Sequence, residues 1–135
     1  MISISVLIKA QFYDLDPMQI VWHGNYVRYL EDARSALLDH IGYNYEQMAQ
    51  SGYAWPIVDL RVKYVKSVKL LQEIKVIATL LEYENRLKIS YRIYDAASED
   101  VLTKAETVQF PVSLKTGDVS LDSPEVFLAA VRRHL

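Results

Sequence analysis

The 135-residue chain contains no cysteine and only three histidines. The missing thiols exclude disulfide bonds, thiolate nucleophiles and cysteine-ligated metals together. The histidines stand far apart, at positions 23, 40 and 134, so we expect no histidine metal cluster. The chain also lacks a run approaching the ~20 apolar residues that span a bilayer, and no basic flank precedes a long apolar stretch near residue 1. We therefore expect a cytoplasmic protein without a bound metal or a membrane span.

A strong charge imbalance is missing as well. The formal net charge is −2, with 24% charged and 51% hydrophobic residues. This composition is typical of a folded globular protein and not of a disordered chain or one that coats nucleic acid. Glycine and proline are scarce, with four of each, and no linker or repeat is visible. Length and composition thus predict a single domain over residues 1–135 with no nucleic-acid partner.

The chain does contain one long helical pattern, between residues 25 and 41. Its apolar residues recur at intervals of three and four, which places them on one face of a helix. Asn25 is a candidate N-cap, and Gly42 is a candidate left-handed stop. A half-buried helix from about Asn25 to Ile41 is therefore expected. The apolar positions of this face are Tyr26, Leu30, Ala33, Leu37 and Ile41.

Most of the remaining chain alternates between apolar and polar residues, as half-buried strands do. The segments with this alternation are 2–12, 58–64, 73–82, 87–93 and 101–114. The last strand is expected to bend near Pro111, the polar stretch 43–53 to form turns, and Ser123-Pro124-Glu125 to open a short helix. Short turns between consecutive strands favour antiparallel pairing. The prediction is an α+β fold, with an antiparallel sheet of about five strands, one long central helix and a short C-terminal helix.

The residues with chemical potential lie just before the long helix. Asp14-Leu15-Asp16-Pro17 leads through an apolar link to His23-Gly24. The first N–H groups of a helix lack acceptors and carry the positive end of the helix dipole, so they can stabilise an oxyanion. One continuous segment could thus supply both an attacking carboxylate and an oxyanion site.

Each of these residues also has an ordinary structural interpretation. Aspartates around a turn proline often bond only to their own backbone. His23, beside a glycine, could be a capping or surface residue, and Trp22 could belong to the core or to an interface.

The segment resembles a known family through Asp14-Leu15-Asp16-Pro17, with Val21, His23 and Tyr26 at their present offsets. It is similar to the hotdog-fold acyl-CoA thioesterases of the 4-hydroxybenzoyl-CoA thioesterase and YbgC-like type. The resemblance extends over nearly the whole chain. It implies an antiparallel sheet wrapped around a long central helix, and hydrolysis of an acyl-CoA thioester.

The same resemblance implies roles for individual residues. Asp16 is the catalytic carboxylate, acting as base or nucleophile, and the backbone amide of His23 polarises the thioester carbonyl. Val21, Trp22 and Tyr26 are implied to bind substrate. No metal or organic cofactor is implied, because coenzyme A is part of the substrate.

The family also implies a homodimer or homotetramer. Each site is expected to lie in a cleft between subunits, with pocket residues from the segment 55–64 of the second one. One difference from the family is visible: relatives usually carry glycine three residues after the catalytic aspartate, where this chain has Gln19.

Three other functions fit parts of the pattern. An aspartate-nucleophile phosphotransferase would need a parallel sheet. A hotdog domain could bind acyl-CoA without hydrolysing it. A thioesterase could instead take its acyl group from acyl carrier protein, recognised by a basic patch. The cations for such a patch, which also fit the solvated face of a strand, are Lys63, Lys66 and Lys69, or Arg86, Lys88 and Arg92. The acyl chain itself is left open.

Overall fold

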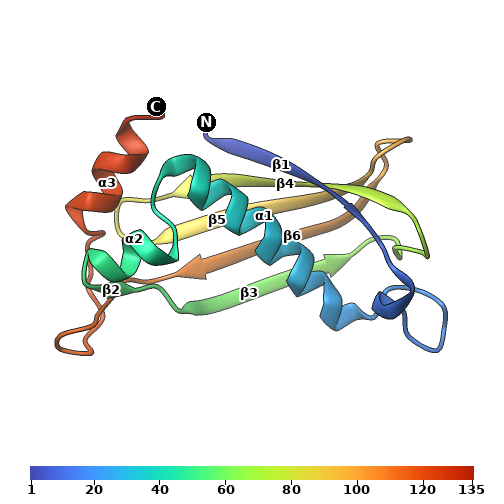
Figure 1. The fold of residues 1–135 in the computed structure, drawn as a ribbon, viewed down its shortest axis with the longest axis horizontal. Helices are drawn as coiled ribbons and strands as arrows, with labels where there is room; N and C mark the ends of the chain where they lie inside the picture. The colour runs from blue at the N-terminus through green and yellow to red at the C-terminus, as the bar shows by residue number, and fades with distance from the viewer.

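The alternating segments form one antiparallel sheet in the computed structural model, which describes residues 1–135. One long helix, α1 (Tyr26–Ile41), lies across one face of this sheet (Figure 1). The expected α+β fold is therefore confirmed. In spatial order the strands are β1 (Ser3–Lys9), β4 (Glu73–Glu82), β5 (Leu87–Asp95), β6 (Val101–Gln109) and β3 (Ile57–Tyr64).

The smaller elements gather at the two ends of the sheet. Near the start of α1 lie two 3₁₀ turns, η1 (Phe12–Asp14) and η2 (His23–Asn25). At the other end (Figure 1) are α2 (Tyr45–Gln50), α3 (Glu125–Arg132) and the short pair β2 (Tyr53–Ala54) and β7 (Val112–Ser113). No helix is long and apolar enough to cross a membrane.

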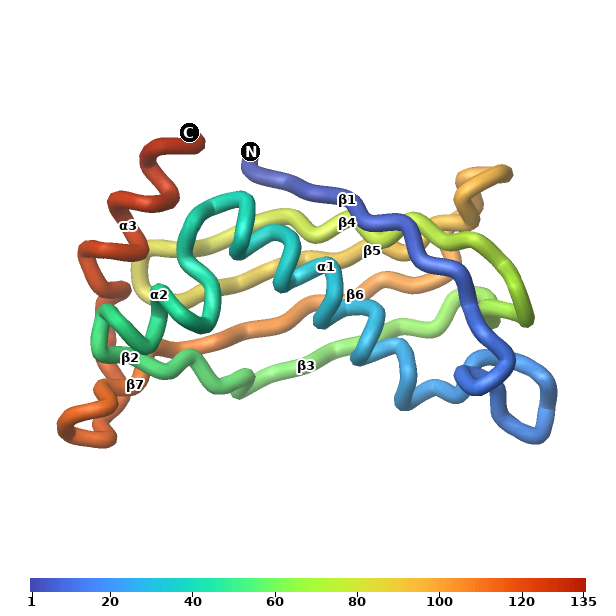
Figure 2. The backbone as a smooth tube through the Cα atoms, viewed as in Figure 1, coloured from blue at the N-terminus to red at the C-terminus, as the bar shows by residue number.

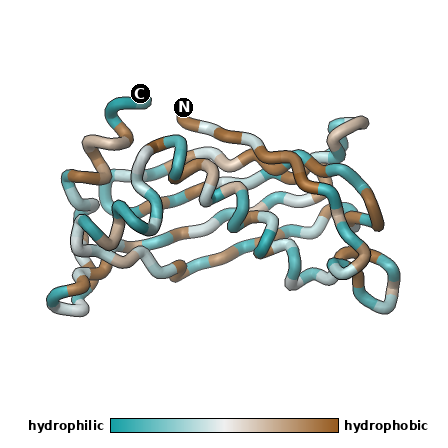
Figure 3. Tube along the Cα trace, in the orientation of Figure 1, coloured by the Kyte–Doolittle hydropathy of each residue, from teal (hydrophilic) through white to brown (hydrophobic).

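The core lies between α1 and the inner face of the sheet. Apolar and polar residues alternate along the strands (Figure 3), so one face of each strand turns toward the helix. Leu30, Ala33 and Leu37 of α1 are buried against this face, as their helical spacing predicts. Burying each such leucine stabilises the fold by about 1.5–3 kcal/mol.

The two ends of α1 differ from each other in how they are held. Gly42 adopts the expected left-handed conformation (φ 89°), and its N–H bonds to the carbonyls of Leu38 and Asp39. The expected capping by Asn25 is wrong, because its side chain does not bond to the first turn of the helix. Asn25 Nδ2 instead donates to the Asp14 carbonyl (2.9 Å), and the η2 turn precedes the helix.

Two local predictions need correction near the other end of the sheet. The stretch expected to form only turns contains α2, which Asn44 caps by accepting the Tyr45 N–H (2.8 Å). The helix α3 begins with Pro124 as its cap, while the Ser123 hydroxyl donates to the Tyr83 carbonyl. Both errors concern short helices, whose ends depend on a few local hydrogen bonds.

The edges of the sheet are β1 and β3, which lie on opposite sides in the chain trace (Figure 2). Nearly every residue of β3 is exposed, including the apolar residues Val58 and Leu60, whereas the central strand β5 is mostly buried. An edge strand with apolar side chains is a surface on which another chain can pair.

Candidate active site

The residues expected to carry the chemistry meet in a tight loop between β1 and α1. The Asp16 N–H bonds to the Ile20 carbonyl (2.9 Å), and the Trp22 N–H bonds to the Asp14 carbonyl (2.9 Å). These bonds hold the two halves of the loop side by side, with Leu15 opposite Val21. The loop therefore places Trp22, which precedes His23, beside Asp14, two residues before Asp16.

Asp14 is the buried anchor of this loop, with only 5% of its surface exposed. Its Oδ2 atom accepts hydrogen bonds from the Tyr29 hydroxyl (2.9 Å) and from the Gln11 N–H (2.9 Å). Burial, followed by the neighbouring Asp14 carboxylate, raises the pKa of Tyr29. The Asp14 carbonyl also accepts the Trp22 N–H and Asn25 Nδ2. Asp14 thus fixes the loop to the first turns of α1.

Asp16 is placed differently, at the rim of a hollow of about 550 Å³. Its Oδ1 atom accepts the Met18 N–H (2.8 Å), as a turn-forming aspartate does. Its Oδ2 atom has no hydrogen-bond or ion-pair partner within the chain. One carboxylate oxygen is therefore held and the other is free to react. The other residues around the hollow are Phe12, Tyr13, Leu15, Pro17, Gln19 and Leu70.

His23 and Gly24 begin the η2 turn and present their backbone N–H groups. Asn25 is the first residue whose N–H bonds within the turn, to the Trp22 carbonyl (2.9 Å). The His23 and Gly24 N–H groups therefore have no acceptor inside the turn. The 16-residue helix α1 follows directly and adds the positive end of its dipole.

Trp22 covers the start of this turn. A Cβ atom at Gly24 would lie only 2.4 Å from the Trp22 indole, so the ring in this position requires glycine. The indole also lies 5.3 Å from the His23 ring and is 49% exposed. It is the one residue of the predicted substrate-binding set that offers substantial surface.

Val21 and Tyr26, the other two residues of that set, are buried in the core. The Val21 N–H bonds to the Val68 carbonyl (2.8 Å), and the Tyr26 hydroxyl accepts the Val68 N–H (3.0 Å). Burial is the largest cause raising the pKa of Tyr26, and the charge of Asp16 contributes in the same direction. Both residues connect the loop and the start of α1 to the backbone of Val68. Their contact with substrate stays a prediction.

The backbone at Gln19 gives a physical reason for the glycine that relatives carry there. Gln19 has φ of 65°, in the left-handed region that favours glycine. The Gln19 N–H bonds to the Asp16 carbonyl (2.9 Å), so this conformation closes the loop behind the carboxylate. The chain keeps the loop shape without the usual residue.

Sequence reasoning missed a role for Tyr64 beyond its place in a strand. Its hydroxyl donates to the His23 carbonyl (2.9 Å), at the junction of the η2 turn and α1. The two residues are 41 positions apart, so no local pattern could reveal the contact. Only the position of β3 beside the start of α1 (Figure 1) brings them together.

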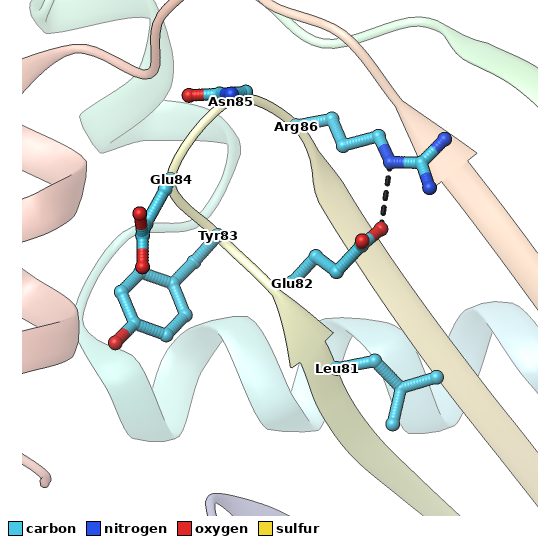
Figure 4. Close-up of a pocket in the computed structure, with 6 residues that line it drawn as sticks. All are labelled: Leu81, Glu82, Tyr83, Glu84, Asn85 and Arg86. Atoms are coloured by element: carbon cyan, nitrogen blue, oxygen red, sulfur yellow. Dashed lines mark hydrogen bonds and ion pairs between the residues drawn. The ribbon is translucent and has the colours of Figure 1, made fainter.

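Another hollow lies away from the predicted site residues. This hollow, shown in Figure 4, is formed by a single hairpin, residues 81–86, at the opposite end of the sheet from Asp16. Two of its charged groups form an ion pair, since Arg86 Nε lies 2.6 Å from a Glu82 oxygen. No three histidine, aspartate or glutamate side chains gather in a way that could hold a metal ion. The hollow at Asp16 is therefore the candidate active site.

Similarity to known proteins places the chain among the hydrolases that act on thioesters. More specifically, the chain belongs to the Thioesterase-like superfamily, whose profile matches residues 10–131, and it is a thioester hydrolase. A relative from Bacillus subtilis, named as a putative acyl-CoA thioesterase, is 34% identical over 94 residues, which are 68% of this chain and 67% of the relative.

Solved structures agree with this assignment. A DHNA-CoA thioesterase from Staphylococcus aureus superposes with a TM-score of 0.87 at 26% identity, covering 99% of this chain and 91% of that one. A 4-hydroxybenzoyl-CoA thioesterase bound to 4-hydroxybenzoyl-CoA has a TM-score of 0.83 at 17% identity, over 96% of this chain and 99% of the other. The expected hotdog fold is confirmed by these similarities.

Proposed function

We propose that the protein hydrolyses the thioester of an acyl-CoA at Asp16, beside the first N–H groups of the η2 turn. The observation that carries this proposal is the free Oδ2 atom of Asp16, at the rim of a largely apolar hollow. An unpaired carboxylate oxygen on the same loop as unpaired N–H donors matches the needs of thioester attack, because one group reacts and the other stabilises charge.

In the proposed mechanism the thioester oxygen accepts a hydrogen bond from the His23 N–H. This bond strengthens as negative charge develops on the oxygen during attack. Asp16 either attacks the carbonyl carbon or removes a proton from a water molecule that attacks it. In the first route the carbon–sulfur bond breaks, CoA leaves as thiolate, and water hydrolyses the resulting anhydride. In the second, hydroxide adds and the same thiolate leaves.

The proposed reaction needs no metal or organic cofactor, since a thioester is already a reactive acyl donor. Coenzyme A enters as part of the substrate. The hollow beside Asp16 includes the aromatic side chains of Phe12 and Tyr13, and the two solved structures described above are named for aromatic acyl-CoA substrates. Aromatic acyl groups are therefore the first substrates to test, followed by short and long aliphatic ones.

Assembly is part of the proposal. Strand β3 offers an unpaired edge with exposed apolar side chains, and Tyr64 at its end contacts the η2 turn. Pairing of two copies along this edge would cover apolar surface. We expect a homodimer, or a homotetramer built from such dimers, with the cleft between subunits holding the substrate.

An acyl carrier protein is the second candidate for the acyl donor, because of a row of cations on the outer face of the sheet. Arg92 on β5 lies directly opposite Lys104 on β6, which in turn lies opposite Lys63 on β3. None of the three forms an ion pair, and like charges placed directly opposite destabilise a sheet. A row of this kind suits an acidic partner.

Three of the other four cations considered for a basic patch are already paired, and Lys69 is the exception. Lys66 pairs with Asp100 (3.5 Å), Lys88 with Glu106 (3.6 Å) and Arg86 with Glu82 (2.6 Å). Activity on an acyl carrier protein substrate should therefore depend on Lys104. A Lys104→Glu variant that loses activity on acyl carrier protein but keeps it on acyl-CoA would identify the carrier.

The experiment that tests the proposed function replaces Asp16 and follows thiol release from aromatic, short and long acyl-CoAs. Asp16→Asn is nearly isosteric but can act neither as base nor as nucleophile, so kcat should fall by about 100- to 10,000-fold. Asp14→Asn, in which an amide oxygen can still accept the Tyr29 hydroxyl, should lose much less.

Two results would contradict this assignment. An Asp16→Asn enzyme with near wild-type kcat, while Asp14→Asn is inactive, would move the catalytic role to the buried aspartate. A wild-type protein that binds acyl-CoA in calorimetry but releases no thiol would make the chain a non-catalytic binding domain.

A further inference from the structure

The carbonyl of His23 is held by two donors that come from different parts of the fold. The Tyr64 hydroxyl, at the end of edge strand β3, donates to it at 2.9 Å. The Tyr26 N–H donates to the same oxygen from the first residue of α1. Strand β3 and helix α1 therefore both donate a hydrogen bond to one atom of the η2 turn, the His23 carbonyl oxygen.

Holding this carbonyl also fixes the direction of an N–H group. The His23 carbonyl and the Gly24 N–H belong to one peptide unit, which is planar with its oxygen and hydrogen on opposite sides. A bond that orients the oxygen therefore orients the Gly24 N–H as well. Gly24 has no side chain that could fix its backbone, so it depends on such external contacts.

The aromatic ring of Tyr64 is itself well supported. It lies edge-on to Tyr26, with centroids 4.9 Å apart at 90°, and edge-on to His23 at 6.5 Å. The ring can therefore keep its place when only the hydroxyl is removed. Burial raises the pKa of Tyr64 above its usual value near 10, so the hydroxyl remains a donor throughout the neutral range.

We infer that Tyr64 is a positioning residue, whose hydroxyl aims the N–H groups of the His23–Gly24 turn at the thioester oxygen. The Gly24 N–H then acts beside the His23 N–H as a second donor to the developing oxyanion. The inference rests on the proposed function, because it assigns these donors to the thioester. It also links catalysis to β3, the strand on which a second subunit would pair.

The test is a Tyr64→Phe variant, with Tyr94→Phe as the matched control. Tyr94 lies on the outer face of β5 and its hydroxyl forms no hydrogen bond within the chain. Tyr64→Phe should lower kcat roughly 10-fold, since a small misplacement of reacting groups can cost up to ~100-fold. KM and the melting temperature should change little, and the affinity for an inert thioether analogue of acyl-CoA, which lacks the carbonyl, should be unchanged.

A purely structural role gives a different result. In that case Tyr64→Phe would lower the melting temperature or the thioether affinity, and kcat would stay at the wild-type value. That outcome, or an equal loss of kcat in Tyr94→Phe, overturns the inference. The shape of the pH profile for kcat should be the same in wild type and Tyr64→Phe, because Tyr64 does not titrate in the range of activity.

A second measurement keeps the two proposals separate. The NMR order parameter of the Gly24 N–H, which reports how firmly this bond is oriented, should fall in Tyr64→Phe and not in Tyr94→Phe, whether or not the protein hydrolyses acyl-CoA. An unchanged order parameter overturns the positioning role. If it falls as expected but wild type releases no thiol from any acyl-CoA, the proposed function fails while the effect of Tyr64 on the turn stands.

Discussion

Gln19 holds a backbone conformation that costs a side-chain-bearing residue about 1–2 kcal/mol. Its φ of 65° closes the loop behind Asp16. Gln19→Gly removes this strain. It also adds backbone freedom to the unfolded chain, which lowers the free energy of unfolding by roughly 0.5–1 kcal/mol. We therefore expect a net gain of about 0.5–1 kcal/mol, measured as a higher urea midpoint. The neighbouring Met18→Gly, where φ is not positive, should instead lower the midpoint, and the same gain at both sites would contradict this account.

His23 is predicted to act through its backbone N–H and not through its ring. The ring is exposed and contacts Trp22 and Tyr64 only by aromatic packing. His23→Ala should therefore lose no more than about 10-fold in kcat, whereas loss of a general base costs about 100- to 10,000-fold. Steady-state kinetics across pH check this. A loss in the larger range would require a histidine mechanism.

At the level of residues, the sequence identifies groups whose neighbours lie close in the chain. Asp16 and His23 stand seven positions apart and the loop between them is closed by local hydrogen bonds. Tyr64 escapes detection because its partner is 41 positions away. The different environments of Asp14 and Asp16 also depend on folding, since Asp14 is buried and accepts a hydrogen bond from Tyr29 in α1.

At the level of elements, α1 and the central strands β4 and β5 follow from apolar spacing, because each buries one face. The expected strand 73–82 has the same bounds as β4. The short helix α2 could not be found in this way, since it buries a single residue, Met48, and shows no apolar face. The apolar–polar alternation also could not predict that β3 pairs with β6, because this pairing joins segments more than 35 residues apart.

The turn between β5 and β6 is expected to be acid-sensitive. Hydrogen bonds from the Ser98 N–H, Gln72 Nε2 and the Ala97 N–H lower the pKa of Asp95 to about 2. The unfolded chain binds this proton near pH 3.9, so the stabilisation from Asp95 is complete above about pH 4 and lost as pH falls toward 2.

Asp95→Ala should therefore be less stable than wild type at pH 7, and the difference should shrink as pH falls from 4 to 2. Thermal unfolding across this range measures it. Asp118→Ala, which removes a carboxylate with no hydrogen bond or ion pair in the chain, is the control and should show no such dependence. A difference for Asp95→Ala that stays constant down to pH 2 would contradict the assignment.

At the level of the whole molecule, the two edges of the sheet are not equivalent. Leu7 on β1 and Leu60 on β3 both expose apolar surface, at 73% and 41%. Of these two strands, β3 contacts the η2 turn, through the hydrogen bond from Tyr64 to the His23 carbonyl. If a second subunit pairs along β3, each site contains Asp16 and the His23 N–H of one subunit and pocket residues of the other. Activity should then depend on dimerisation.

A charge placed on each edge in turn distinguishes pairing along β3 from pairing along β1. Leu60→Lys should weaken pairing along β3, so the dimer fraction and specific activity should fall together on dilution and recover at high protein concentration. Leu7→Lys, on the opposite edge, should leave both unchanged. Light scattering and thiol release, measured on the same dilution series, give the two quantities. A tetramer that keeps this pairing satisfies the prediction, whereas a fully active wild-type monomer at nanomolar concentration excludes a shared site.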